Sequence, residues 1–166
     1  MCHGMLCGGW TNENQGGAQT CERFEATTGT FTLLPVELRQ RRAYIPCWGL
    51  ESGDVLLFGG WTWSSQSSSM VNNNVTERVS ADGSSSSYDF TMVSPFRRLS
   101  CGIAVGDTFV VTGGEDRLDS VVRYTEDGFA TSLPSLKDGR HNHACSTFVN
   151  DDGETVRNLT PCKIHA

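Results

Sequence analysis

The sequence is short of basic residues. Its 166 residues include 13 Lys and Arg against 19 Asp and Glu, which gives a formal net charge of −6. Proteins that bind DNA or RNA need a basic footprint, because much of their affinity comes from counterions released from the phosphates. The composition therefore argues against nucleic acid as a partner.

Long apolar segments are missing as well. No stretch approaches the about 18 apolar residues that a membrane helix needs. The first ten residues lack the basic start and apolar centre of a signal peptide. We therefore expect no membrane partner, and the sequence shows no targeting signal. Cysteine is modest, at seven, so disulfides are not expected to be the main source of stability.

Helical periodicity is absent, and short apolar runs bounded by glycine take its place. The runs at 55–58 and 109–111 have the length of strands, and glycine is abundant at 18 residues. With 37% hydrophobic residues, the chain has enough apolar material for a core of ordinary size. These features predict an all-β protein.

The sequence also repeats itself at intervals of roughly fifty residues, which is typical of repeat architectures. Three glycine pairs each end an apolar run, and their first members lie 51 and 54 residues apart. A turn glycine, an aromatic residue, a proline and a cysteine follow each pair in the same order. The pairs are Gly8-Gly9, Gly59-Gly60 and Gly113-Gly114, and the recurring cysteines are Cys47, Cys101 and Cys145.

Each cycle predicts four short antiparallel strands. Gly106-Asp107 and the segment 125–128 should form tight hairpins, because Gly and Asp tolerate the backbone that such turns require. Four antiparallel strands per repeat make a propeller blade. The count gives about two full blades, with three strands of another before them and one or two of a fourth after them. In the third cycle the predicted strands are 101–105, 109–112, 121–124 and 129–132.

These motifs resemble the kelch family. Val-Leu-Leu-Phe-Gly-Gly at 55–60 and Phe-Val-Val-Thr-Gly-Gly at 109–114 look like its apolar strand ending in Gly-Gly. The stretch 127–145 is similar to divergent kelch-like proteins of invertebrates, with Phe where the family usually has Trp. The resemblance implies an incomplete kelch-type β-propeller over residues 4–154 and a divergent tail over 155–166. Open blades expose strand edges, so we expect the isolated chain to aggregate or to need a partner.

The resemblance also implies where a partner would dock. Loops that follow the glycine pairs and loops that enter the next blade should emerge on one face, and they are rich in Trp and Arg, which are enriched at interface hot spots. We predict that this face binds a protein or peptide with acidic groups. Alternatively, the arginines hold blades together and the tryptophans cover blade ends. The candidates are Trp10, Trp61, Trp63, Arg39, Arg41, Arg42, Arg97, Arg98, Lys137 and Arg140.

The cysteines divide into two groups. Cys7 and Cys21 lie on consecutive predicted strands near one loop, so they are candidates for a cross-strand disulfide. Cys47, Cys101 and Cys145 share one repeat position, where we expect small buried side chains that lie too far apart to bond.

No metal site or cofactor is expected. His141 and His143 are two apart on a predicted strand and would share a face. However, Ile45 and Leu99 stand at the position of His143 in the other copies, so His143 is expected to pack. The glycine pairs are expected to be structural, because no Lys-Ser/Thr follows them as in a phosphate loop.

Polar segments add little to the functional prediction. The serine-rich runs at 64–69 and 84–87 are predicted to be solvated loops. Asn74 and Asn158 begin glycosylation sequons, which count only in a secreted protein. With the candidate disulfide they slightly favour an extracellular parent protein, and the compartment stays open.

The sequence thus predicts a non-catalytic, kelch-type interaction scaffold. Fold analogy leaves open a carbohydrate-active propeller or one like galactose oxidase, a copper radical enzyme that needs a Tyr-Cys cross-link with His and Tyr ligands. No such set of residues can be assigned here. A third hypothesis is a truncated product without independent function, because the repeat loses its register after residue 150.

Overall fold

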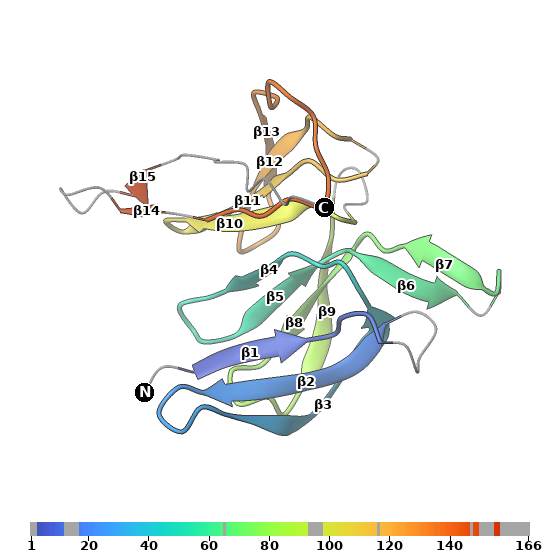
Figure 1. The fold of residues 1–166 in the computed structure, drawn as a ribbon, viewed down its shortest axis with the longest axis vertical. Coiled ribbons are helices and arrows are strands. Elements are labelled where there is room, and N and C mark those ends of the chain that lie inside the picture. The colour runs from blue at the N-terminus through green and yellow to red at the C-terminus, as the bar shows by residue number, and fades with distance from the viewer. Residues whose placement is uncertain are drawn as a thin grey trace.

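A computed structural model describes residues 3–11, 17–64, 66–92, 98–115, 117–146, 148–149 and 155–156. Within these ranges the chain is all-β and forms several small antiparallel sheets, which confirms the predicted class (Figure 1). Among the residues described, none belongs to a helix with the length and apolar character needed to cross a membrane.

The first sheet has three strands in the order β1-β2-β3. Strand β1 is an edge strand, since β2 is the only described strand that pairs with it. The long pairing of β2 with β3 contains two register shifts, between Ala18 and Thr20 and between Thr20 and Glu22. The strands are β1 His3–Cys7, β2 Ala18–Glu25 and β3 Thr30–Arg42.

The second sheet has four strands in the order β4-β5-β8-β9, and the hairpin β6-β7 is inserted between β5 and β8. The loop predicted over 64–69 is therefore wrong at both ends, since Ser64 on β6 pairs with Ser69 on β7. The flanking pairs Thr62–Val71 and Trp63–Met70 supply the cross-strand contacts that stabilise a hairpin. The strands are β4 Cys47–Gly49, β5 Val55–Phe58, β6 Trp61–Ser64, β7 Ser69–Asn72, β8 Val75–Val79 and β9 Ser86–Thr91.

The third sheet has four strands in chain order and matches its sequence prediction to within one residue at each end. Its first hairpin turns at Gly106, where φ is +58°. In the second sheet, the prediction of a loop over the serine run 84–87 is partly wrong, because strand β9 begins at Ser86. The strands are β10 Cys101–Val105, β11 Thr108–Thr112, β12 Val121–Thr125 and β13 Ala130–Leu133, followed by the short pair β14 Phe148–Val149 and β15 Thr155–Val156.

The same turn closes the last hairpin of the second and third sheets. A hydroxyl residue, one intervening residue, an aspartate and a glycine occur at 80–83 and at 125–128. Gly83 N donates to Ser80 O at 2.8 Å, and Gly128 N donates to Thr125 O at 3.0 Å. Both glycines have positive φ, +70° and +86°, which explains why glycine ends this turn.

The second sheet is buried on both faces. Along β5, Leu57 packs into a cluster with Leu34, Val36 and Leu38 of the first sheet. The next residue, Phe58, points the other way, into a cluster built with the third sheet. Figure 1 shows the three sheets in succession, with the second in the middle. The second cluster comprises Trp48, Leu50, Leu56, Phe58, Met92, Phe109, Val111, Val122 and Tyr124.

The contact between consecutive sheets also repeats. Leu34 of β3 lies against Gly83 in the second sheet, and Phe90 of β9 lies against Gly128 in the third. In each case a Cβ on the glycine would come within 2.6 Å of the apolar side chain. The last strand of one sheet therefore packs on the turn glycine of the next.

Candidate functional site

The glycine pairs lie beside the segments that enter or leave their sheets. Gly9 N donates to Arg42 O at 2.8 Å, and Gly114 N donates to Arg140 O at 3.0 Å. After the middle pair, Trp61 instead exchanges two backbone hydrogen bonds of 2.8 and 2.9 Å with Ala43, in the segment that leads into its own sheet. In the first and third copies the bonds bring the loop after the glycine pair together with the segment that leads into the next sheet, as the sequence predicted.

The glycines are required by this close approach. Gly8 has a φ of +68°, and a Cβ there would lie 2.7 Å from Arg42 O. Gly113 has a φ of +58°, and a Cβ there would collide with Arg140 O. Because the neighbouring atoms are backbone, a larger residue would have to displace the entering segment. The other pair members, Gly9, Gly59, Gly60 and Gly114, also have positive φ.

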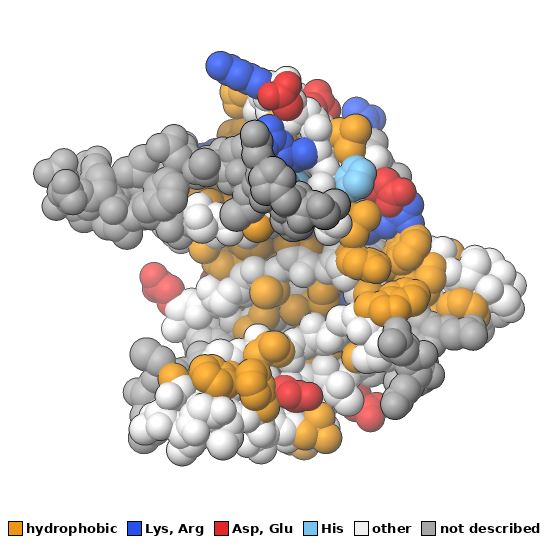
Figure 2. Space-filling view, viewed as in Figure 1, with side chains coloured by type: hydrophobic (Ala, Val, Ile, Leu, Met, Phe, Trp, Pro, Cys, Tyr) orange, Lys and Arg blue, Asp and Glu red, His pale blue; other side chains and the backbone are white. Residues whose placement is uncertain are grey.

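Three aromatic side chains form a row at this junction, which we call the aromatic row: Trp10, Tyr44 and Trp61. The Trp10 and Tyr44 rings stack with centroids 6.2 Å apart, and Tyr44 meets Trp61 edge-on at 5.9 Å. Trp10 is 49% and Tyr44 is 43% exposed. Figure 2 shows hydrophobic side chains gathered next to β6, which begins at Trp61.

Arg98 continues the aromatic row beyond Trp61 and adds a positive charge to it. Its guanidinium carbon lies 4.3 Å from the centre of the Trp61 ring, within cation–π range. The same guanidinium forms an ion pair with Glu115. Glu115 N in turn donates to Arg98 O at 3.2 Å. Arg98 is therefore held in place by an aromatic face and a carboxylate.

Sequence reasoning missed Tyr44, which joins the two predicted tryptophans. It has a φ of +57°, and Leu99 and Asn142, which also lie two or three residues before a repeat-position cysteine, have +56° and +52°. The sequence signal was an aromatic residue between the arginine run and Cys47. It was not used because the repeat landmarks do not include this position.

The remaining docking candidates lie at several different places on the molecule. Trp63 is 37% exposed on β6, two residues beyond Trp61 and hence on the same side of the hairpin. Arg41 is exposed near the end of β3, and Arg140 is half-buried beside Gly114. Arg97 lies outside the described residues. Arg39 and Lys137 are exposed, and Arg39 donates to Ser86 O on the side of β9.

Arg42 is not a surface residue, which corrects the prediction that it belongs to the docking face. Its side chain and that of Glu77 are both completely buried, with Nη2 and Oε2 3.1 Å apart. Nη1 donates to Val75 O at 2.7 Å and to Gly59 O at 3.1 Å. Burial lowers the pKa of Arg42, and the neighbouring Glu77 opposes that shift. Arg42 therefore ties the first sheet to the second, the alternative role considered for the arginines.

The structure joins Cys7 to Cys21 in a disulfide. The two residues are directly opposite each other on β1 and β2, with Cα atoms 4.1 Å apart. Cys47, in contrast, has a free thiol on the edge strand β4 and is exposed, so the prediction that it is buried is wrong. Apolar neighbours still desolvate this thiol and raise its pKa.

Cys101 and Cys145 contradict the prediction that the repeat-position cysteines lie too far apart to bond. Their Cα atoms are 5.9 Å apart, and the structure joins them in a disulfide. The cause is the path of segment 140–145, which runs back along the third sheet. Asn142 N donates to Leu99 O at 2.7 Å, just before β10 begins at Cys101.

His143 lies on the same segment, which is not a strand, so the predicted strand geometry for His141 and His143 is wrong. His143 Nε2 is 2.9 Å from Thr112 Oγ1, and this hydroxyl is 3.7 Å from Cys145 Sγ. Burial, followed by the charges of Arg140 and His141, lowers the pKa of His143. This shift favours the neutral imidazole.

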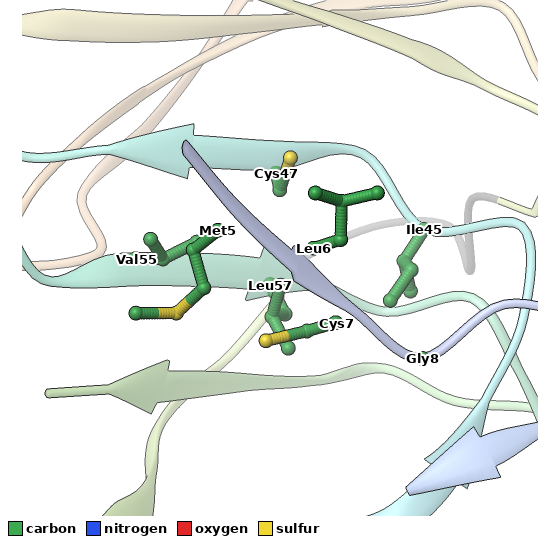
Figure 3. A pocket seen from close by; sticks show the side chains of 8 residues that line it. All are labelled: Met5, Leu6, Cys7, Gly8, Ile45, Cys47, Val55 and Leu57. Carbon is green, nitrogen blue, oxygen red and sulfur yellow. The ribbon is translucent and has the colours of Figure 1, made fainter. Parts of the chain in front are cut away.

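A shallow apolar groove lies between the first and second sheets and has a volume of about 240 Å³. One wall comes from the edge strand β1 and the other from Cys47 on β4, Val55 and Leu57 on β5, and Ile45 (Figure 3). None of the described residues that line the groove is charged, so it offers mainly apolar surface, together with the edge of β1 and the Cys47 thiol.

The predicted glycosylation sites add no functional surface. Asn74 is half-buried between β7 and β8, and its carbonyl accepts from Met92 N at 2.8 Å. Asn158 lies outside the described residues.

Comparison with known proteins supports the fold. No protein-family model matches the chain, and no curated protein matches its sequence. A solved structure, described as "Structure of YjhT", superimposes with a TM-score of 0.72 over 90% of this chain at 12% sequence identity. The chain spans 54% of the length of that structure. At this identity the likeness concerns the fold alone.

Proposed function

We propose that this chain is part of a kelch-type β-propeller and acts as a scaffold that binds a protein or peptide through the aromatic row and its arginines. The observation that carries the proposal is the continuous contact of Trp10, Tyr44, Trp61 and Arg98, of which Trp10 and Tyr44 are exposed and the other two are half-buried. Large amphipathic rings and arginine are the side chains that most often dominate binding energy at interfaces.

Several structural facts support the propeller part of the proposal. Two four-stranded sheets follow one another in the chain, and a three-stranded sheet precedes them. Consecutive sheets pack face to face, with an apolar side chain of one on the turn glycine of the next. Repeated four-stranded units that pack only on their neighbours are the construction principle of propellers.

Charge supports an acidic partner. The chain as a whole is acidic, yet Arg98 lies on the aromatic row, Arg140 is joined to the adjacent Gly114, and Arg41 is exposed close by in the chain. A locally basic surface on an acidic body favours acidic segments and repels other acidic surfaces. Arg98 is the arginine in contact with the aromatic row, and its ion pair with Glu115 reduces the charge that it offers to an acidic partner.

The test is peptide selection followed by affinity measurement. Random peptides displayed on phage are enriched on the immobilised chain, and the affinities of the enriched peptides are measured by fluorescence anisotropy. We expect enrichment of acidic peptides, and we expect Trp10→Ala combined with Trp61→Ala to weaken their binding about tenfold or more. Replacing the acidic residues of a peptide by amides should weaken binding as well.

Phe129→Ala is the matched control, because Phe129 is also an exposed aromatic residue, at 68%, but lies in the turn before β13. Circular dichroism checks that each variant keeps its strand content. The proposal fails if no peptide is enriched, or if enriched peptides bind the double variant as tightly as the unchanged chain.

A further inference from the structure

Three metal-binding side chains meet beside the third sheet, and the docking function proposed above uses none of them. Cys101 begins β10, while His143 and Cys145 lie on the segment that runs back beside it. One ligand atom from each residue lies within 4.8 Å of the other two. All three residues are partly buried, so an ion there would be shielded and still reachable from solvent.

The donor atoms select a class of metal. Two thiolates and one imidazole are the ligands that Zn²⁺ prefers, with a water completing a tetrahedron. Hard cations such as Ca²⁺ and Mg²⁺ require oxygen ligands, which these three side chains do not provide. With Zn–S bonds of about 2.3 Å, the two sulfurs of a tetrahedral site lie roughly 3.8 Å apart, a spacing that fits within the cluster.

The backbone around the three residues is well fixed. Arg140 N donates to Leu118 O at 2.7 Å, and Arg140 O accepts from Gly114 N at 3.0 Å. Asn142 N donates to Leu99 O at 2.7 Å. These bonds hold the segment immediately before His143 against the sheet, so two of the ligands are positioned without any contribution from an ion.

A supporting residue orients the imidazole. Thr112 is completely buried and lies directly opposite Cys101 in the sheet. Its hydroxyl is 2.9 Å from His143 Nε2, whereas His143 Nδ1 is buried and has no hydrogen-bond partner among the residues described. The contact with Thr112 fixes the orientation of the ring, and metal-binding histidines are commonly held by such a hydrogen bond to a neighbouring residue.

We propose that Cys101, His143 and Cys145 form a zinc site when the two cysteines are reduced, and that this site and the Cys101–Cys145 disulfide are alternative states of the same residues. The sequence predicted no metal site, because aligning His143 with Ile45 and Leu99 treated it as a packing residue. The structure instead turns segment 140–145 toward the edge of β10.

A dithiol reductant supplies the electrons and protons for the change from the disulfide state to the zinc-binding state. The dithiol gives two electrons and two protons to the Cys101–Cys145 disulfide, which becomes two thiols, and the dithiol closes its own disulfide. Zn²⁺ then displaces the two thiol protons and binds the two thiolates and the imidazole. Removal of zinc and oxidation by a disulfide of the same class reverse both steps.

Cobalt(II) is a suitable probe, because it occupies tetrahedral zinc sites and absorbs strongly when bound by thiolates. The full chain is reduced with a phosphine in the absence of oxygen, in a variant in which the other cysteines, at positions 2, 7, 21, 47 and 162, are replaced by serine. We expect equimolar cobalt binding with thiolate-to-cobalt absorption, and displacement of cobalt by Zn²⁺. His143→Ala should weaken cobalt binding about tenfold or more.

His141→Ala is the matched control, since His141 is exposed and is not part of the cluster; it should leave cobalt binding unchanged. Absence of thiolate-to-cobalt absorption in the reduced chain would mean that these cysteines form a disulfide only. Absorption and affinity that persist unchanged in His143→Ala would equally overturn the proposal.

A second measurement uses the unmodified chain and does not depend on the folding of any variant. After reduction, iodoacetamide is added with and without Zn²⁺, and alkylated peptides are quantified by mass spectrometry. Zn²⁺ should protect Cys101 and Cys145 at least about tenfold while Cys47 is still alkylated. Equal alkylation of all three cysteines in the presence of Zn²⁺ would contradict the site.

Discussion

At the scale of single residues, the pair of Arg42 and Glu77 is a buried ionic contact between the first two sheets. Both side chains are completely buried, and Glu77 Oε1 also accepts a hydrogen bond of 2.6 Å from Arg39 N. The pair and its backbone partners therefore connect β3 with β5 and β8. Removing one charge would leave the other buried without its partner.

Arg42→Ala should accordingly lower the free energy of unfolding by about 3–5 kcal/mol, the usual cost of an uncompensated buried charge. Arg41→Ala is the control, since this neighbouring side chain is exposed and should change stability by no more than about 0.5 kcal/mol. Urea denaturation followed by circular dichroism measures both. Equal stabilities of the two variants would contradict the role of Arg42.

The sequence could not distinguish Arg42 from its neighbours. Arg39, Arg41 and Arg42 appear as one basic run, and alternation along β3 buries Leu34, Val36 and Leu38. Simple alternation continued from there would bury both residue 40 and residue 42, yet Gln40 is exposed and Arg42 is buried. The register shifts between β2 and β3 interrupt the alternation here, and such irregularities have no reliable signature in a single sequence.

Asp82 provides a test of the repeated turn. Its carboxylate accepts hydrogen bonds from Ser80 Oγ, Ser84 N and Ser84 Oγ at 2.7 to 2.9 Å. The Ser80 hydroxyl first, then the Ser84 groups, lower the pKa of Asp82 to about 2. Because this pKa is below that of the unfolded chain, the turn is stabilised above pH about 4, and the stabilisation is lost as the pH falls through about 2.

Nuclear magnetic resonance titration of the Asp82 carboxyl carbon should therefore show a midpoint near 2 in the folded chain. Ser80→Ala should move the midpoint upward, toward the ordinary value for aspartate, because the largest cause of the shift is removed. An ordinary midpoint in the unchanged chain would mean that the three hydrogen bonds do not persist in solution.

At the scale of strands and turns, glycine allows a left-handed backbone at some positions and also close packing at others, and Gly106 and Gly113 illustrate the difference. Gly106 and Gly113 have the same φ of +58°. A Cβ at Gly106 would have no neighbour within 4 Å, whereas one at Gly113 would collide with Arg140 O. Gly106 serves only the conformation of a hairpin, but Gly113 also allows the entering segment to approach.

Gly113→Ala should therefore destabilise the chain more than Gly106→Ala does. The shared backbone strain costs about 1–2 kcal/mol in both variants, and overpacking adds about 1–3 kcal/mol at Gly113. Urea denaturation gives the difference between the two. Variants that lose the same free energy would show that the glycine pair does not act through close contact with segment 140–145.

The elements differ in how well the sequence predicts them. Strands of the third sheet were predicted closely, because its apolar runs are short and its turns carry Gly and Asp. The hairpin β6-β7 was not predicted, because Ser64 and Ser69 belong to a serine-rich run that is typical of loops. Pairing across the hairpin and the adjoining Trp61–Ala43 bonds outweigh that local preference.

The candidate docking face was predictable in its position but not in its composition. Repeat phase alone places the loops after the glycine pairs next to the entering segments, which the backbone hydrogen bonds show. Which side chains lie on that face depends on burial and on local backbone conformation. Thus Tyr44 joins the row through its positive φ, and Arg42 is withdrawn into the core.

At the scale of the whole molecule, the first sheet presents an open edge. Strand β1 pairs only with β2 among the described strands, and the apolar groove runs along its other side. Leu6 is 53% exposed on this strand. Unpaired, apolar edge strands are templates for association with another chain, and lysine on such an edge discourages it.

Leu6→Lys should therefore reduce self-association of the isolated chain, seen as a smaller weight-average mass in sedimentation equilibrium. Phe129→Lys is the control, because it removes an even more exposed apolar side chain, at 68%, from a turn rather than an edge strand. A chain that is monodisperse and monomeric before any substitution would contradict the expectation that its open edges drive association.

The central claim is that three successive sheets stack through two apolar cores, and it is tested most directly at the second core. The ring of Phe58 on β5 lies 5.4 Å from that of Tyr124 on β12 and 4.8 Å from that of Phe109 on β11, centroid to centroid. We predict nuclear Overhauser effects between the ring protons of Phe58 and those of both partners in the folded chain. A well-dispersed spectrum that lacks these cross-peaks would contradict the stacking of the sheets.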